Sequence, residues 1–280
     1  MSSLKTGSKS AIKCQLKMSM RGHCVELPNR MSRREHFTYL FDNTTTWGSG
    51  RNKLFFHAVE RRLDYIYYIF LEDDIAIKFN EATTPAMKRL SPILVFQDWL
   101  LDYEPAVGAV NYEQDREAKT VLQRRRTLCN THRLVNDASL ANPTISFNPL
   151  LNAFHAKAVT HIFPLDTRHE KVNWWLTDKY VTSVVELKFR GQALLFFPVT
   201  VEDLLHRPYP RSLYGTKAAW QGFIKGIQKQ TPSQYANNVL FEKFKRDPEL
   251  YVATSRTYCM NGIRHQDIAP FAHFERESVM

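Results

Sequence analysis

The chain has 280 residues, of which 44% are hydrophobic and 24% charged, the composition of a globular protein with enough chain to bury a core. Its net charge of +10 is uneven, because residues 1–35 hold eight Lys or Arg against two Glu. The remaining body is only mildly basic, which argues against a nucleic-acid-binding domain. No stretch approaches the ~18 apolar residues of a membrane span.

The basic N-terminal segment is rich in serine and contains no acidic residue through Val25. Transit peptides share this composition, and so do a disordered basic arm and a misplaced gene start. We therefore expect three regions: a disordered arm over 1–35, a main domain over 36–215 and a helical extension over 216–280. Four cysteines without a CxxC pair match neither a zinc pattern nor a dense disulfide framework.

Apolar segments separated by turn-forming residues predict the secondary structure in chain order. His155 and His161 fall on one amphipathic segment and are expected to be packing residues. Residues 113–142 are polar and irregular and predict a mobile insertion. The predicted strands are 36–41, 65–71, 106–112 and 193–201, and the predicted helices are 51–63, 93–103, 149–163 and 173–189.

The order of these elements predicts an α/β fold with a mainly parallel central sheet flanked by helices. A helix lies between the strands 36–41 and 65–71, which implies a right-handed crossover connection. The second of these strands is apolar along almost its whole length, so we expect both of its faces to be covered.

Three carboxylates, Glu72, Asp73 and Asp74, follow the strand 65–71 directly. Like charges this close repel one another unless a positive group lies among them. Hard divalent cations take oxygen ligands, so a metal ion is one candidate. The alternative is an acidic junction neutralised by lysines elsewhere, such as Lys78. Ligands of α/β sheets bind beyond the carboxyl ends of strands, which favours a site here.

The segment DNTTTWGSGRNKL, a helix and then YIYYIFLEDDI resemble the nucleotide-sugar-binding half of GT-A-fold glycosyltransferases, which are Rossmann-related. The resemblance covers about residues 36–211, with Glu72 in place of the first Asp of the family's Asp-x-Asp motif. It implies a nucleotide-sugar donor and Mn²⁺ or Mg²⁺ as cofactor. The implied metal site contains Asp74, Glu72 and His206, and the implied nucleotide contacts are Asp42, Arg51, Asn52, Glu72 and Asp73.

The segment NWWLTDKYV supplies the candidate acceptor site. Trp174 and Trp175 offer flat apolar surfaces against which a sugar ring packs, although at least one of them is expected in the core. By analogy with inverting members of the family, Asp178 would take the proton of the acceptor hydroxyl as general base. Asp166 and Glu170 are competitors for this role, and a retaining enzyme would need no such base.

Two features depart from the family pattern. No apolar strand in residues 1–35 can supply the first βα unit, and no membrane anchor of the kind found in Golgi members is present. The sequence thus predicts a metal-dependent transferase acting on a glycan or glycoprotein, with a Golgi location implied by the resemblance alone. A non-catalytic or truncated relative and a metal-dependent phosphoesterase or nuclease remain the alternatives.

Overall fold

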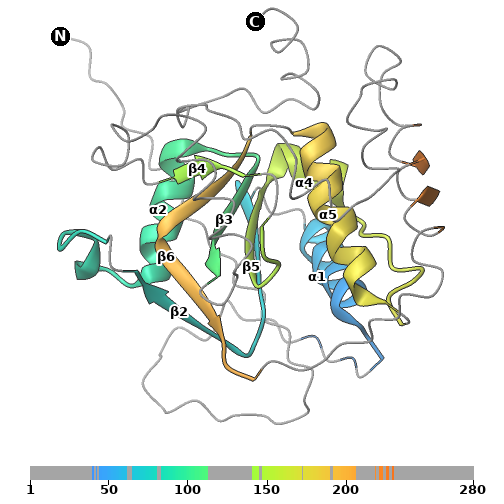
Figure 1. Ribbon diagram of the computed structural model, residues 1–280, viewed down its shortest axis with the longest axis horizontal. Helices are drawn as coiled ribbons and strands as arrows, with labels where there is room; N and C mark the ends of the chain where they lie inside the picture. The colour runs from blue at the N-terminus through green and yellow to red at the C-terminus, as the bar shows by residue number, and fades with distance from the viewer. Residues whose placement is uncertain are drawn as a thin grey trace, which may run out of the picture.

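The computed structural model describes residues 40, 42, 44–61, 65–80, 83–112, 141–144, 147–171, 173–189 and 192–205, with isolated positions between 218 and 229. These residues form an α/β unit (Figure 1). Its elements are α1 (Trp47–Glu60), β1 (Tyr67–Leu71), β2 (Ile75–Phe79), η2 (Met87–Arg89), α2 (Pro92–Tyr103), β3 (Val107–Tyr112), β4 (Ala141–Pro143), β5 (Leu151–His155), α4 (Ala156–Ile162), α5 (Trp174–Lys188) and β6 (Ala193–Asp203).

The central sheet is mixed, with the strand order β1-β5-β3-β6-β2 and β4 paired to β6. Only the β3–β6 pair is parallel, and the pairs β1–β5, β3–β5, β2–β6 and β4–β6 are antiparallel. The prediction of a mainly parallel sheet is therefore wrong, whereas the α/β class is confirmed. The strands β1, β3 and β6 nevertheless run in the same direction, so their carboxyl ends lie at one end of the sheet.

The missed antiparallel pairing comes from the segment predicted as one helix over 149–163. It forms the strand β5 and then the helix α4. Residues 151–154 are all apolar or small except Asn152, and such a short run does not distinguish a buried strand from a helix. The backbone pairs on both sides with β1 and β3, so neighbouring strands decide its conformation. The helices α2 and α5 lie within one residue of their predicted bounds, whereas α1 begins four residues before its predicted start, at Trp47 in the segment predicted as a loop.

The sheet is strongly curled. β1 and β2 are its two edges, yet only three residues, 72–74, connect them. Four strand spacings would separate the edges by about 19 Å in a flat sheet, whereas four residues of extended chain reach at most about 14 Å. The two edges must therefore approach each other at the end where Leu71 leads into Ile75.

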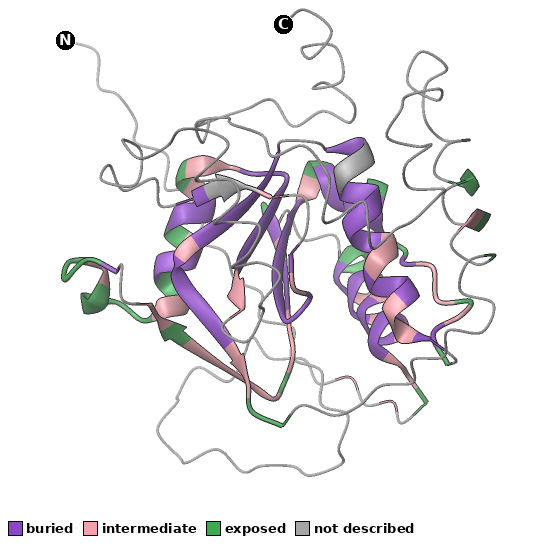
Figure 2. Ribbon diagram, in the orientation of Figure 1, coloured by how far each residue is buried: buried purple, intermediate pink, exposed green. Residues whose placement is uncertain are grey.

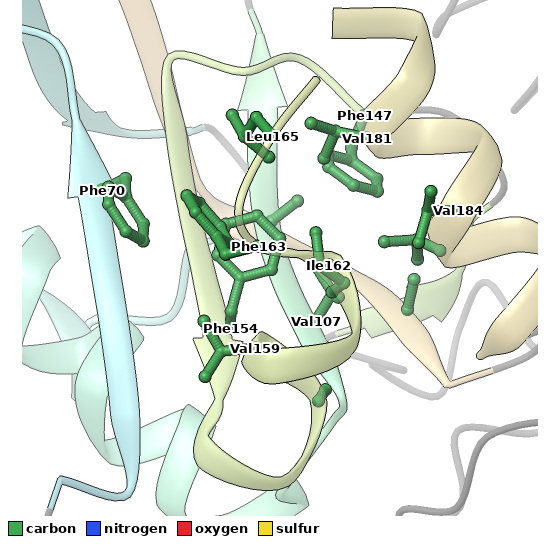
Figure 3. Close-up of a cluster of buried hydrophobic side chains, with 14 of the residues drawn as sticks. Phe70, Val107, Phe147, Phe154, Val159, Ile162, Phe163, Leu165, Val181 and Val184 are labelled. Atoms are coloured by element: carbon green, nitrogen blue, oxygen red, sulfur yellow. The ribbon is translucent and has the colours of Figure 1, made fainter. Parts of the chain in front are cut away.

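Helices cover both faces of the sheet, α2 on one and α1, α4 and α5 on the other (Figure 1). The strands β1, β3, β5 and β6 are buried along most of their length, whereas β2 is half-buried to exposed (Figure 2). In β1, Tyr67 and Ile69 face the α2 side while Phe70 faces the other side. This arrangement confirms that the strand is covered on both faces. The core between the sheet and α1, α4 and α5 is the larger of the two cores. In this larger core, Phe163 stacks on Phe70 with ring centroids 4.9 Å apart, beside Phe154 (Figure 3).

Gly108 in β3 lies against α2 with no room for a side chain. A β-carbon there would lie 2.3 Å from Leu100 Cδ2 and 3.1 Å from Trp99 Cζ3. We expect Gly108→Ala to lower the free energy of unfolding by about 1–3 kcal/mol through overpacking, measured by urea unfolding. Gly222→Ala is the matched control, since a β-carbon there meets nothing within 4 Å. An unchanged midpoint for Gly108→Ala would contradict the close packing.

Several predictions lie outside the described residues: the arm 1–35, most of the strand 36–41, nearly all of the insertion 113–142 and most of the extension 216–280. Residues 141–142 of that insertion belong to β4. Within the described part of the chain, no helix combines the length and apolar character needed to cross a bilayer.

Candidate functional site

The candidate site lies at the end of the sheet where β1 and β6 finish. Glu72 and Asp74 are in the turn between β1 and β2, and Asp203 ends β6 opposite Ile75, the first residue of β2. The Leu204 N–H donates to the Asp74 carbonyl at 2.9 Å, which fixes the two chain segments to each other. We call Glu72, Asp74 and Asp203 the acidic junction.

Glu72 is a half-buried member of the acidic junction, with its side chain 15% exposed. Burial raises the pKa of its carboxyl above the usual value, and the charges of Asp74 and Asp203 act in the same direction. The Arg51 guanidinium and a hydrogen bond from Trp47 oppose this rise in pKa. The carboxylates are therefore close enough to influence one another, and Glu72 has a positive partner in the protein itself.

The positive partner of Glu72 is Arg51, a residue of α1. Arg51 Nη2 lies 3.8 Å from Glu72 Oε1, and Trp47 Nε1 donates to the same oxygen at 2.8 Å. Arg51 also donates to the Pro149 carbonyl, and its guanidinium lies 4.4 Å from the centroid of the Trp47 ring. Charge-assisted hydrogen bonds and cation–π contact of this kind hold a buried arginine in one orientation. Trp47 and Arg51 thus fix the position of the Glu72 carboxylate.

The start of α1 is itself held by Glu170, one of the residues predicted as a competitor for the general base. Its carboxylate accepts from Thr46 Oγ1, from the Gly48 N–H and, at 3.2 Å, from the Ser49 N–H. The first N–H groups of a helix have no partner within the helix, and a carboxylate satisfies them and complements the helix dipole. Glu170 therefore caps α1 and anchors Trp47.

Trp174, at the start of α5, joins the same cluster. Its ring packs edge-on against Trp47 with centroids 6.2 Å apart. Gly48 permits this close approach of α1 and α5, because a β-carbon there would lie 2.7 Å from Thr177 Cγ2. One predicted acceptor residue, Trp174, is thereby brought near the predicted donor residues Arg51 and Glu72, with Trp47 between them.

The other predicted acceptor residues lie in a different setting. Trp175 is half-buried against the larger core, with Lys179 Nζ 5.4 Å from its ring centroid. This position confirms that one of the two tryptophans is a packing residue. Asp178 is largely buried one helical turn after Trp174, and its Oδ2 lies 3.9 Å from Lys179 Nζ. The competitor Asp166 forms an exposed ion pair with Arg168.

Asp42 and Asn52 make contacts that organise the chain around α1. Asp42 accepts from the Thr44 hydroxyl at 2.7 Å, from Lys53 Nζ at 2.9 Å and from the Thr44 N–H at 2.8 Å, and these bonds lower the pKa of its carboxyl well below the usual range. The Asn52 amide donates to the Leu165 carbonyl and accepts from the Leu165 N–H, at 2.9 and 2.6 Å. Both side chains thus stabilise the loops that flank α1.

Two predicted residues remain to be located. Asp73 is exposed in the turn between β1 and β2, and His206 lies outside the described residues. In the part of the chain that is described, no group of three or more His, Cys, Asp or Glu side chains has an arrangement that could hold a metal ion. The oxygens of the acidic junction are nevertheless of the donor type that Mg²⁺ and Mn²⁺ prefer.

The sequence interpretation missed Trp47, Glu170 as a cap, and Asp203. Trp47 stands within the turn-rich TTTWGSG segment, and Asp203 follows the predicted strand 193–201 by two residues. An acidic residue just beyond a buried strand is the same signal that identified Glu72, so Asp203 could have been found. Comparison with known proteins gives no family: no family model, no curated protein and no solved structure matches the chain.

Proposed function

We propose that this chain is a metal-dependent glycosyltransferase that moves a sugar from a nucleotide-sugar donor, a UDP-sugar, to a glycan or glycoprotein acceptor. The observation that supports it is the position of Glu72, Asp74 and Asp203 at the end of the sheet where β1 and β6 finish. Ligands of α/β sheets bind at this end, and a diphosphate is joined to a carboxylate cluster most readily through a divalent cation.

The residues of the acidic junction take distinct roles in this proposal. Asp74 and Asp203, with His206, would hold Mn²⁺ or Mg²⁺ together with the donor diphosphate. The ion, when bound, would supply Lewis-acid stabilisation of the departing diphosphate. Glu72, which Arg51 and Trp47 hold in place, would orient a water or the ribose hydroxyls, and the exposed Asp73 would contact the nucleotide from the turn.

The acceptor side rests on α5. The ring of Trp174, which packs on Trp47, would support the C–H face of the acceptor sugar, as flat indole surfaces do. Asp178 would accept the proton of the attacking hydroxyl as general base, which requires an ionised carboxylate within hydrogen-bond reach of that hydroxyl. In an inverting reaction this residue would be needed, and in a retaining one it would not.

A second candidate is a binding protein without catalysis. The observation that favours it is the pairing of Glu72 with Arg51 and Trp47. A carboxylate already neutralised by a buried guanidinium contributes less to cation binding. In this case the cluster of Trp47, Arg51 and Trp174 would recognise a nucleotide or sugar directly, and binding would be independent of metal.

Thermal unfolding with Mn²⁺ and UDP distinguishes the glycosyltransferase from the binding protein. A ligand at a hundred times its dissociation constant stabilises the native state by about 2.7 kcal/mol, or about 5–10 °C in a domain of this size. For the glycosyltransferase we expect this rise only with both ligands, and its loss in Asp74→Asn. Asp98→Asn, at an exposed position of α2, is the control and should keep the rise.

The remaining outcomes decide against the transferase. A rise with UDP alone that survives in Asp74→Asn would favour the binding protein. No rise with either ligand, in a protein that unfolds cooperatively, would contradict both candidates.

A further inference from the structure

The helix α4 begins at an unusual cap. His155, the last residue of β5, accepts a hydrogen bond at Nδ1 from the Lys157 N–H at 3.1 Å. A histidine can accept there only when Nδ1 carries no proton, so the neutral imidazole caps the helix and the imidazolium does not. The cap of α4 is therefore tied to the protonation state of one side chain.

The surroundings of His155 disfavour its charged form. The residue is only 8% exposed, and the Tyr67 ring of β1 packs edge-on against it with centroids 5.0 Å apart. Burial lowers the pKa of the imidazole below its ordinary value; the Glu104 carboxylate raises this pKa and Lys157 lowers it. Among the described residues, the titratable groups that contact His155 or act on its charge are Tyr67 of β1, Glu104 at the end of α2 and Lys157 of α4.

Glu104 has a backbone conformation that singles it out. It ends α2 at φ 44°, in the left-handed region, and no other non-glycine residue of the described chain has a positive φ. Such a conformation disfavours a residue with a side chain and is usually taken by glycine. Here a glutamate occupies it and places its charge where both Tyr67 and His155 experience it. The Glu104 carboxylate therefore favours the protonated form of His155.

We propose that His155 is an acid-sensitive switch that releases the start of α4 when its imidazole is protonated and can no longer accept the Lys157 N–H. A group whose pKa is lowered in the folded state binds more protons when the structure opens. The stability of α4 is therefore complete above pH ~6.5, falls as the pH drops below that value, and reaches its minimum below the folded-state pKa.

Release of the start of α4 would affect the candidate site through side chains that pack against one another. Phe163 follows α4 directly and stacks on Phe70, whose ring lies 5.6 Å from the Arg51 guanidinium. The Asn52 side chain of α1 holds Leu165 in the same loop by two hydrogen bonds. Loosening of α4 therefore loosens the support beneath Arg51, whatever the site binds, so the switch does not depend on the proposed function.

Two measurements on the full chain test the switch. Amide hydrogen exchange between pH 7.5 and 5.0, corrected for the intrinsic rate, gives the protection of Lys157 and Phe163 at the two ends of α4. NMR titration of the His155 ring gives its pKa in the same protein. We expect protection to fall by up to about tenfold per pH unit below 6.5 and to level off below the pKa that the ring titration gives.

Variants separate the switch from a purely structural cap. His155→Asn supplies a side-chain oxygen that accepts the same N–H without titrating, so the pH dependence of α4 protection should vanish. Glu104→Gln should move the His155 titration to lower pH, and His169→Asn, outside α4, should leave both measurements unchanged. The switch is refuted by pH-independent α4 protection, by the same pH dependence in His155→Asn, or by an equal fall in β5 and α5.

Discussion

Arg51→Met is expected to lower the free energy of unfolding by about 3–5 kcal/mol, the cost of breaking a buried ion pair from one side. Arg51 is 6% exposed, lies 3.8 Å from Glu72 Oε1 and donates to the Pro149 carbonyl. Methionine preserves much of the apolar volume but leaves the carboxylate and the carbonyl without this donor. Urea unfolding followed by tryptophan fluorescence measures the loss.

Two further variants define the origin of this effect. Arg51→Met combined with Glu72→Gln removes the uncompensated charge, so we expect part of the lost stability to return. Lys53→Met breaks the exposed pair with Asp42, in which the lysine side chain is 41% exposed, and should cost much less than Arg51→Met because solvent screens exposed pairs. If Arg51→Met cost no more than Lys53→Met, the buried pair could not be what fixes Glu72.

Glu170→Ala is expected to lower the free energy of unfolding by about 2–3 kcal/mol, because it removes a helix cap and leaves the buried Gly48 N–H without its acceptor. Three groups at the start of α1, Thr46 Oγ1 and the N–H groups of Gly48 and Ser49, donate to this carboxylate. The side chain is 2% exposed, so water cannot readily replace it. Chemical unfolding measures the loss.

The glutamine variant serves as the control for charge. Glu170→Gln retains one oxygen acceptor at the start of α1 but loses the negative charge, so its loss of stability should fall between wild type and Glu170→Ala. Because Trp47 is the first residue of α1, both variants should also alter indole fluorescence. A Glu170→Ala protein with wild-type stability and fluorescence would show that the cap does not anchor Trp47.

Much of the fold follows from local patterns. The helices α2 and α5 carry apolar residues at helical spacing, and β1, β3 and β6 are short apolar runs between turn signals, so each was predicted close to its observed bounds, whereas the start of α1 was placed four residues too late. β2 and β5 were missed for a physical reason. The conformation of β5 depends on hydrogen bonds to β1 and β3, and that of β2 on pairing with β6. Such long-range pairing overrides local preference.

The candidate site, like the fold, was predictable only where a local sequence pattern marks a residue. A carboxylate directly after a buried strand identified Glu72, but its contact with Trp47 joins residues 25 positions apart. The capping of α1 by Glu170 spans more than 120 positions, and no local pattern indicates such a partner. Arg51 was expected near a nucleotide because of the family resemblance, whereas in the structure it pairs with Glu72.

The most direct test of the proposed transferase is a titration of the full chain with Mn²⁺ at saturating UDP, followed by electron paramagnetic resonance of the free ion. The acidic junction of Glu72, Asp74 and Asp203 predicts loss of the free-ion signal up to one equivalent, with UDP required and with the loss abolished in Asp74→Asn. A free-ion signal that rises in proportion to added Mn²⁺ from the first addition, in folded wild-type protein, would contradict it.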